Sequence, residues 1–265
     1  MAEPAPIIDI HCHLLPELDD GAASWDDAVA MARMAAADGV TACIVTPHQL
    51  GAFGRNRGEC IRAQTARFQA LLDREGIALR VLPGAEARIE PGLVAKLQSG
   101  DVLTLADRRR HVLLELPHEV YLPVDRLLTE LSAAGMVPIL AHPERNAGIL
   151  ARPEVLPPLV EAGCLLQVTA GSVLGAFGPA TQALAQRLIR QGLVDFLATD
   201  AHGVRSRRPL LSRGMDWVSQ AVGLEVALDL CCRNPACVAE GRDIPTSHAR
   251  PTRSQLGRWL RRKAG

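Results

Sequence analysis

Residues 6–13 read PIIDIHCH, a short apolar run that is rich in β-forming residues and ends in polar side chains. A run of this length, followed by a loop, is typical of a buried β-strand. The same pattern recurs along the chain, each time followed by a segment with helical periodicity. We count seven such runs, at residues 6–13, 40–48, 78–86, 111–116, 136–142, 164–169 and 194–200.

Strands that alternate with helices predict a parallel sheet. Seven strands in 265 residues favour closure, so we predict an α/β fold, a distorted seven-stranded (β/α)7 TIM-like barrel in a single domain. An open, doubly wound sheet is the alternative. The clearest helix runs from Ser24, which can cap its first turn, to Asp38, and Gly39 ends it.

The chain has no internal repeat and no low-complexity linker before about residue 243. We therefore predict one barrel over residues 1–243 and a C-terminal tail over residues 244–265. In this tail Leu256, Trp259 and Leu260 alternate with arginines, which predicts either a short basic amphipathic helix or a frayed, self-packed end.

The overall composition narrows the class of protein. The formal net charge is +0 and the pI is about 7.1, so no global basic field draws the chain to nucleic acid. No apolar run reaches the roughly 20 residues that cross a bilayer, and no secretory signal is evident at the N-terminus, so we expect a cytoplasmic protein without a transmembrane segment.

Cysteine usage argues against a disulfide scaffold. The chain has an odd number of cysteines, 7, and Cys12, Cys43 and Cys164 lie inside apolar runs where a thiol packs as a small hydrophobe. We expect Cys231, Cys232 and Cys237 to pack in a helix rather than bind a metal, because they form no Cys-x-x-Cys pair.

Six of the seven strand candidates end in, or lead directly to, a side chain that can ligate a metal. In barrels of this kind the carboxyl ends of the strands converge on one mouth, where the active site lies. The period of two along a strand places the two histidines of the first run on the same side. These candidate ligands are His11, His13, His48, Glu86, Glu115, His142, Asp200 and His202.

Imidazole and carboxylate ligands without cysteine suit Mn²⁺, Zn²⁺ or Fe²⁺. The candidates exceed the needs of one tetrahedral site, which predicts two or three ions. Clusters of this type clamp the attacking and leaving oxygens in a phosphoryl displacement.

The order of these motifs resembles the PHP (polymerase and histidinol phosphatase) family. Within that family it is most similar to the bacterial manganese-dependent protein-tyrosine phosphatases that are encoded with capsule and exopolysaccharide genes. The resemblance extends from about Ile7 to Pro235, and it rests on His11-x-His13, Asp19-Asp20-Gly21, Thr46-Pro47-His48, Gly84-Ala85-Glu86, Glu115, Ala141-His142-Pro143-Glu144-Arg145 and Asp200-Ala201-His202.

The resemblance implies three divalent ions per chain, with manganese favoured. The first would be held by His11, His13, Glu86 and Asp200; the second by Glu86, Glu115 and His142; and the third by Asp20, His48 and His202. It also implies that Arg145 and Arg207 bind phosphate, and a planar guanidinium can bind two phosphoryl oxygens at once.

The implied function is direct hydrolysis of a phosphomonoester by a metal-activated water, most specifically on a tyrosine-phosphorylated protein such as the tail of a tyrosine kinase linked to capsule or exopolysaccharide synthesis. A cysteine-dependent route is excluded, because none of the cysteines is followed by arginine at the sixth position. A small-molecule phosphatase, such as one for histidinol phosphate, and a non-catalytic metal-binding module are the alternatives. The oligomeric state is left open.

The remaining polar residues receive simpler interpretations. We expect His111 at the surface, His118 in a loop hydrogen bond, and Glu119 and Glu144 in solvent. We expect Asp9 to orient one of the imidazoles near it.

Overall fold

The computed structural model describes residues 5–245. Within them the predicted seven runs form nine parallel strands, because two runs are each divided. The strands are β1 (Ile7–Cys12), β2 (Val40–Val45), β3 (His48–Gln49), β4 (Arg80–Pro83), β5 (Glu86–Arg88), β6 (His111–Glu115), β7 (Val137–Ala141), β8 (Leu165–Thr169) and β9 (Phe196–Ala198).

The strands form two parallel sheets, with the orders β1-β2-β4 and β3-β5-β6-β7-β8-β9. The prediction of a parallel α/β fold is confirmed, but the seven-stranded closed barrel is not found among the described residues. The sheets adjoin beside β1 and β9, where His13 N donates to Ala201 O and Asp200 N donates to His11 O, each at 2.8 Å.

Both breaks in the predicted strands have local causes. Pro47 separates β2 from β3 and has no N–H for the ladder, although its carbonyl accepts from Glu86 N at 3.3 Å. Gly84 separates β4 from β5, and a Cβ there would lie 2.7 Å from Ile44 Cγ2. After these breaks, His48 of β3 and Glu86 of β5 lie opposite each other in the second sheet.

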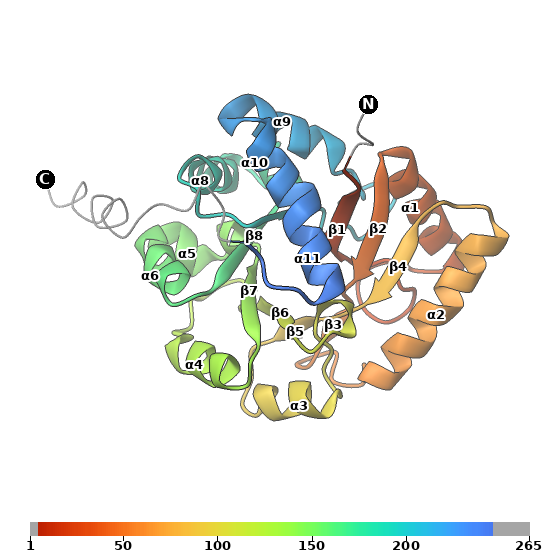
Figure 1. Ribbon diagram of the computed structural model, residues 1–265, viewed down its shortest axis with the longest axis horizontal. Helices are drawn as coiled ribbons and strands as arrows, with labels where there is room; N and C mark the ends of the chain where they lie inside the picture. Colours follow the sequence, from red (N-terminus) through yellow and green to blue (C-terminus); the bar gives the residue numbers. More distant parts are fainter. Residues whose placement is uncertain (1–4, 246–265) are drawn as a thin grey trace, which may run out of the picture.

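Helices surround the strands, as Figure 1 shows in a view in which α11 crosses the centre. The α-helices are α1 (Trp25–Ala37), α2 (Gly58–Arg74), α3 (Leu93–Ser99), α4 (Asp125–Ala133), α5 (Ala147–Ala151), α6 (Leu156–Glu161), α7 (Ala170–Val173), α8 (Pro179–Arg190), α9 (Ser212–Val222), α10 (Leu224–Leu228) and α11 (Asn234–Glu240). Short 3-10 turns lie at η1 (Leu105–Asp107), η2 (Pro143–Arg145) and η3 (Pro153–Val155), and the π-turn η4 (Asp229–Arg233) joins α10 to α11.

The predicted first helix is confirmed with its cap. Ser24 Oγ accepts from Asp27 N at 3.1 Å, and Gly39 follows the helix with a φ of +94°. This left-handed conformation strains any side chain and therefore favours glycine.

An apolar cluster lies between the sheets and is covered by the C-terminal helix. Ile10, Ile44, Leu113 and Phe196 come from four strands, and Val238 of α11 joins them. This packing fixes the strands, so the residues that follow their carboxyl ends sit on a rigid base.

Histidine and cysteine burial tests two of the simpler predictions. His111 is only 1% exposed, so the prediction of a surface residue is wrong: the ring points into the protein at the start of β6. Cys12, Cys43 and Cys164 are buried as expected, and so are the three cysteines of η4 and α11.

No helix among residues 5–245 is long and apolar enough to cross a membrane. The predicted boundary at residue 243 stays a prediction. The predicted amphipathic helix, with Leu256, Trp259 and Leu260, lies outside the described residues.

Candidate active site

The candidate ligands converge at the carboxyl ends of the strands. His11 is the second-last residue of β1 and Glu115 the last of β6. His48 and Glu86 begin the short continuations β3 and β5, and the others lie in the loops that follow β1, β7 and β9. The fold thus brings together all nine candidate ligands predicted from the sequence: His11, His13, Asp20, His48, Glu86, Glu115, His142, Asp200 and His202.

The first group consists of His11, His13, Glu86 and Asp200, all of them buried. His11 Nε2 lies 3.2 Å from His13 Nε2, 3.2 Å from Glu86 Oε2 and 3.2 Å from Asp200 Oδ1. His13 Nε2 lies 3.5 Å from each of the same two oxygens. Ligands about 2.0–2.1 Å from a tetrahedral ion lie roughly 3.3 Å apart, so the spacing fits one divalent ion.

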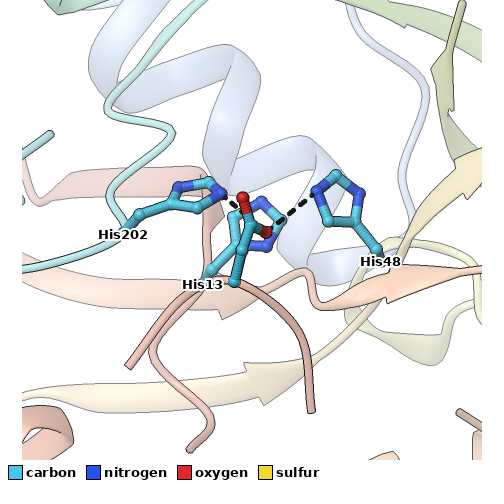
Figure 2. A group of neighbouring side chains, drawn as sticks. His13, His48 and His202 are labelled. Atoms are coloured by element: carbon cyan, nitrogen blue, oxygen red, sulfur yellow. Dashed lines mark ion pairs between the residues drawn. The ribbon is translucent and has the colours of Figure 1, made fainter. Parts of the chain in front are cut away.

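A second group surrounds Asp20, whose Oδ1 lies 3.4 Å from both His48 Nε2 and His202 Nε2. Figure 2 shows the imidazoles of His13, His48 and His202 gathered around one point. The His13 and His202 ring centroids are 3.9 Å apart. The residues assigned to the third ion by resemblance are therefore neighbours in space.

The third group consists of His48, Glu86 and Glu115. It differs from the second ion of the resemblance, to which His142 was assigned in place of His48. His48 Nδ1 lies 3.2 Å from Glu86 Oε2 and 3.5 Å from Glu115 Oε2, so His48 stands between two groups. His142 reaches the other carboxylate oxygen, with Nε2 2.8 Å from Glu86 Oε1. Glu86 is thus the side chain that links the groups, as a bridging ligand would be.

Two residues that we did not single out from the sequence orient the imidazoles. Asp19 Oδ2 lies 2.6 Å from His13 Nδ1 and also accepts from His48 N at 2.9 Å. Gln167 Oε1 lies 2.8 Å from His11 Nδ1. Each contact engages Nδ1 and leaves Nε2 facing the group, the role that outer partners of metal-bound histidines have.

Both residues carried only weak signals in the sequence. Asp19 is part of the motif Asp19-Asp20-Gly21, in which only Asp20 received a role. Gln167 lies on β8, the strand that supplies no candidate ligand. The only signal in the sequence is a glutamine inside an apolar run, and such a residue, which is buried here, needs a hydrogen-bond partner. Gly21 lets the loop fold back, since a Cβ there would lie 2.3 Å from His13 O.

The charges of the site balance one another. Burial alone would lower the pKa of His13, but Asp19, Asp200 and Glu86 outweigh burial and hold that pKa well above its usual value. Burial would raise the pKa of Glu86, yet His11 and His142 hold it well below its usual range. The carboxylates therefore stabilise positive charge here, whether it is carried by protons or by metal ions.

His142 and Glu115 are shifted in the opposite sense. Burial, with Arg145 nearby, lowers the pKa of His142 to about 4, so its imidazole is neutral as a metal ligand must be. Burial and the Glu86 carboxylate raise the pKa of Glu115 to about 7. A cation bound between Glu86 and Glu115 would relieve this repulsion.

Three buried ligand atoms have no hydrogen-bond partner among the described residues: Glu86 Oε2, Asp200 Oδ1 and His202 Nε2. Buried polar atoms are almost always paired, so these atoms require another partner. The two carboxylate oxygens face imidazoles and His202 Nε2 faces the Asp20 carboxylate, each at metal-ligand spacing, so the side chains fit divalent ions.

A further group of ligand-type atoms, Asp9, Cys12 and Cys43, has a different explanation. Burial raises the pKa of both thiols, and the Asp9 oxygens already accept from His11 N and from Thr199. Asp9 thus holds backbone rather than an imidazole, so its predicted role is wrong. The two thiols pack as buried small side chains.

Both predicted phosphate-binding arginines point at the ligand groups. Arg145 Nη1 and Arg207 Nη2 donate to the same oxygen, Asp200 Oδ2, the second at 2.6 Å. The side chain of Arg145 is 12% exposed and that of Arg207 26%. The structure thus places two guanidinium groups beside the candidate ligands, and their role in phosphate binding stays a prediction.

The structure also tests the simpler predictions for Glu144, His118 and Glu119. Glu144, predicted in solvent, is fully buried, and its Oε1 accepts from Thr169 N at 2.9 Å, so that prediction is wrong. His118 is exposed, stacks near His142 at 5.9 Å between ring centroids, and lies 3.6 Å from Glu115 Oε1. Glu119 is exposed as predicted.

Residues 7–240 match the family described as "Capsular polysaccharide synthesis, CpsB/CapC". The chain belongs to the CpsB/CapC family. It is 38% identical over 203 residues to the tyrosine-protein phosphatase YwqE of Bacillus subtilis, covering 76% of this chain and 79% of the relative. It is 24% identical over 234 residues to the tyrosine-protein phosphatase CpsB of Streptococcus pneumoniae, covering 86% and 96%.

A solved structure agrees with this family membership. One from the work on YwqE of Bacillus subtilis and CpsB of Streptococcus pneumoniae, described as metal-dependent tyrosine phosphatases, has a TM-score of 0.87 and 34% identity, covering 93% of this chain and 100% of that one. A phosphotriesterase homology protein from Escherichia coli has a TM-score of 0.58 at 14% identity, covering 89% and 99%, which shows a shared fold alone.

Proposed function

We propose that this chain is a metal-dependent protein-tyrosine phosphatase. The observation that carries the proposal is the convergence of four ligand atoms, in which the two histidine nitrogens lie 3.2–3.5 Å from each other and from both carboxylate oxygens, with two guanidinium groups on the outer oxygen of Asp200. A phosphoryl group needs both features, because cations and planar donors together neutralise its oxygens.

The candidate ligands support a cluster of three divalent ions, with manganese favoured. His11, His13, Glu86 and Asp200 would hold the first, Glu86, Glu115 and His142 the second, and Asp20, His48 and His202 the third. Oxygen and nitrogen ligands without sulfur support Mn²⁺, with Zn²⁺ or Fe²⁺ as alternatives. When bound, such ions supply Lewis acidity and acidify a water so that it can attack phosphorus near neutral pH.

The side chains of the protein do the remaining work. Arg145 and Arg207 would bind the phosphoryl oxygens and turn the ester for in-line attack. Asp19 and Gln167 hold His13 and His11 in the orientation that leaves Nε2 free for a ligand role. A tyrosine leaving group has a pKa of about 10, so it departs more readily than an alkyl alcohol.

The proposed substrate is a tyrosine-phosphorylated protein, such as the tail of a tyrosine kinase that acts in capsule or exopolysaccharide synthesis. The names of the relatives and of the family support this substrate. All 7 cysteines are free, which supports action in a reducing compartment such as the cytoplasm.

The test compares kcat/KM for a phosphotyrosine peptide, a phosphoserine peptide of the same sequence and histidinol phosphate on one manganese-loaded preparation. We expect the phosphotyrosine peptide to be hydrolysed best. A clear preference for histidinol phosphate would refute the protein substrate and leave the metal assignment standing. If a chain loaded with metal hydrolysed none of the three, the phosphatase proposal itself would fail.

A further inference from the structure

Phe177 lies in the turn between α7 and α8, and its ring packs against Arg145. The Arg145 Cζ atom is 4.5 Å from the centroid of the Phe177 ring. A guanidinium within about 6 Å of an aromatic centroid is attracted to the face of the ring. Phe177 is half-buried, so this contact is partly shielded from water.

Arg145 is held from two further directions. Its backbone N donates to His142 O at 3.0 Å, which fixes the main chain of Arg145 at the end of the short turn η2. Its Nη1 donates to Asp200 Oδ2. Phe177 thus contacts the planar face of the Arg145 guanidinium, while Asp200 accepts from an N–H at its edge.

The turn that carries Phe177 is itself fixed. Ala176 N donates to Gly171 O at 2.9 Å, and the amides of Gln182 and Gln186 donate to Val173 O at 3.2 and 3.0 Å. A Cβ on Gly171 would lie 3.2 Å from Phe177 Cε2, so the glycine leaves room for the ring. The ring is therefore a firm surface for the arginine.

Arg207 provides an internal comparison. It also donates to Asp200 Oδ2, at 2.6 Å, but its side chain is more exposed, and no aromatic ring among residues 5–245 packs on its guanidinium. Of the two arginines that face the ligand groups, Arg145 is the one whose plane is restrained.

We propose that Phe177 is a positioning residue: its ring holds the guanidinium of Arg145 edge-on to the phosphoryl group of the substrate. The proposal rests on the proposed function, because it takes Arg145 as a phosphate-binding residue. An arginine side chain loses considerable rotamer freedom when it is ordered, and restraint before binding reduces that loss.

The experiment is a double-mutant cycle on manganese-loaded protein. The variants are Phe177→Leu, which keeps an apolar side chain but removes the ring, Arg145→Ala, and the two combined. Phe177→Tyr keeps an aromatic ring at this position. Leu174→Ala, which changes an exposed side chain next to the same turn, is the matched control. Two quantities are measured: kcat/KM for a phosphotyrosine peptide, and the Kd of inorganic phosphate by calorimetry.

We expect Phe177→Leu to weaken phosphate binding and to lower kcat/KM by about tenfold, on the scale of one shielded cation–π contact. In the Arg145→Ala background the same change should have less than about a twofold effect, because residues that act through each other are not additive. Phe177→Tyr should recover most of the loss, and Leu174→Ala should behave as the unmodified chain.

An equal loss from Phe177→Leu in both backgrounds would overturn the proposal, since the ring would then act by general packing or by direct contact with substrate. No loss in either background would overturn it as well. These outcomes differ from failure of the proposed function, which would appear as no hydrolysis of the phosphotyrosine peptide by the unmodified metal-loaded chain.

Discussion

The two ends of the parallel strands differ in the groups that surround their histidines. At the carboxyl ends, carboxylates hold the pKa of His11, His13 and His48 above its usual value against the effect of burial, whereas burial prevails at His142 and His202 and lowers theirs. At the amino end of β6, burial lowers the pKa of His111 to about 4. Neither ring nitrogen of His111 has a hydrogen-bond partner in the part of the chain that the structure describes.

The difference lies in what the surroundings provide. At the mouth, carboxylates stabilise positive charge on the buried imidazoles. At the amino end, His111 lines a cavity of about 170 Å³ with Val137, Leu165 and Asp243, and burial together with Arg110 outweighs the Asp243 carboxylate.

The strongest test of this contrast is removal of divalent metal. We expect chelation to abolish phosphatase activity and added Mn²⁺ to restore it, because the mouth is arranged around cations. Elemental analysis of the loaded protein should find more than one ion per chain. Full turnover after stripping would show that the carboxylates serve another purpose.

Ligand substitutions sharpen the same comparison at single residues. His13→Ala or Asp200→Asn should lower kcat by several orders of magnitude and reduce bound metal, because each removes a candidate ligand at the carboxyl ends of the strands. Cys12→Ser is the matched control: it lies between the two ligands of β1, but its thiol packs inward and donates to Ile44 O at 3.5 Å. If Cys12→Ser were as damaging as His13→Ala, the assignment of faces on β1 would be wrong.

A smaller effect is expected at the phosphate-binding arginine. Arg145→Ala should raise the barrier to hydrolysis by about 2–4 kcal/mol, because it removes charge-assisted donors from the transition state. Arg145→Lys should recover only part of this loss, since it restores charge without the planar fork. The measurement is kcat/KM with a phosphotyrosine peptide, and equal activity of the Lys variant and the unmodified chain would contradict the need for two parallel donors.

The sequence predicted the features that depend on local spacing. Strand positions, the cap of α1 and the approach of His11, His13, Asp200 and His202 follow from short-range periodicity and from the convergence of parallel strands. The resemblance supplied the remaining ligand, Asp20, which no strand end indicated.

What could not be predicted depends on contacts between distant segments. The division of one strand at Gly84 reflects a close approach to Ile44 of β2 that no local pattern reveals. Glu144 is buried, and its Oε1 accepts from Thr169 N at the end of β8, a contact that no local pattern reveals. Gln167 has no motif around it, and its role appears only in the fold, where its side chain on β8 reaches His11 of β1.

The prediction with the smallest effect on function concerns the opposite end of the strands. His111 has a folded-state pKa of about 4, below the roughly 6.5 of an unfolded chain, so the unfolded state binds a proton first as the pH falls. The contribution of His111 to stability is therefore intact above pH ~6.5 and decreases as the pH falls towards 4.

His111→Leu removes this proton linkage and sacrifices no hydrogen bond that the described residues make. We expect the variant and the unmodified chain to have similar free energies of unfolding at pH 7.5, and the variant to be more stable by about 2 kcal/mol at pH 5. Denaturant titrations of both proteins at the two pH values measure the difference. An equal pH dependence in both would show that His111 is protonated without penalty and that the two ends of the strands do not differ as the structure indicates.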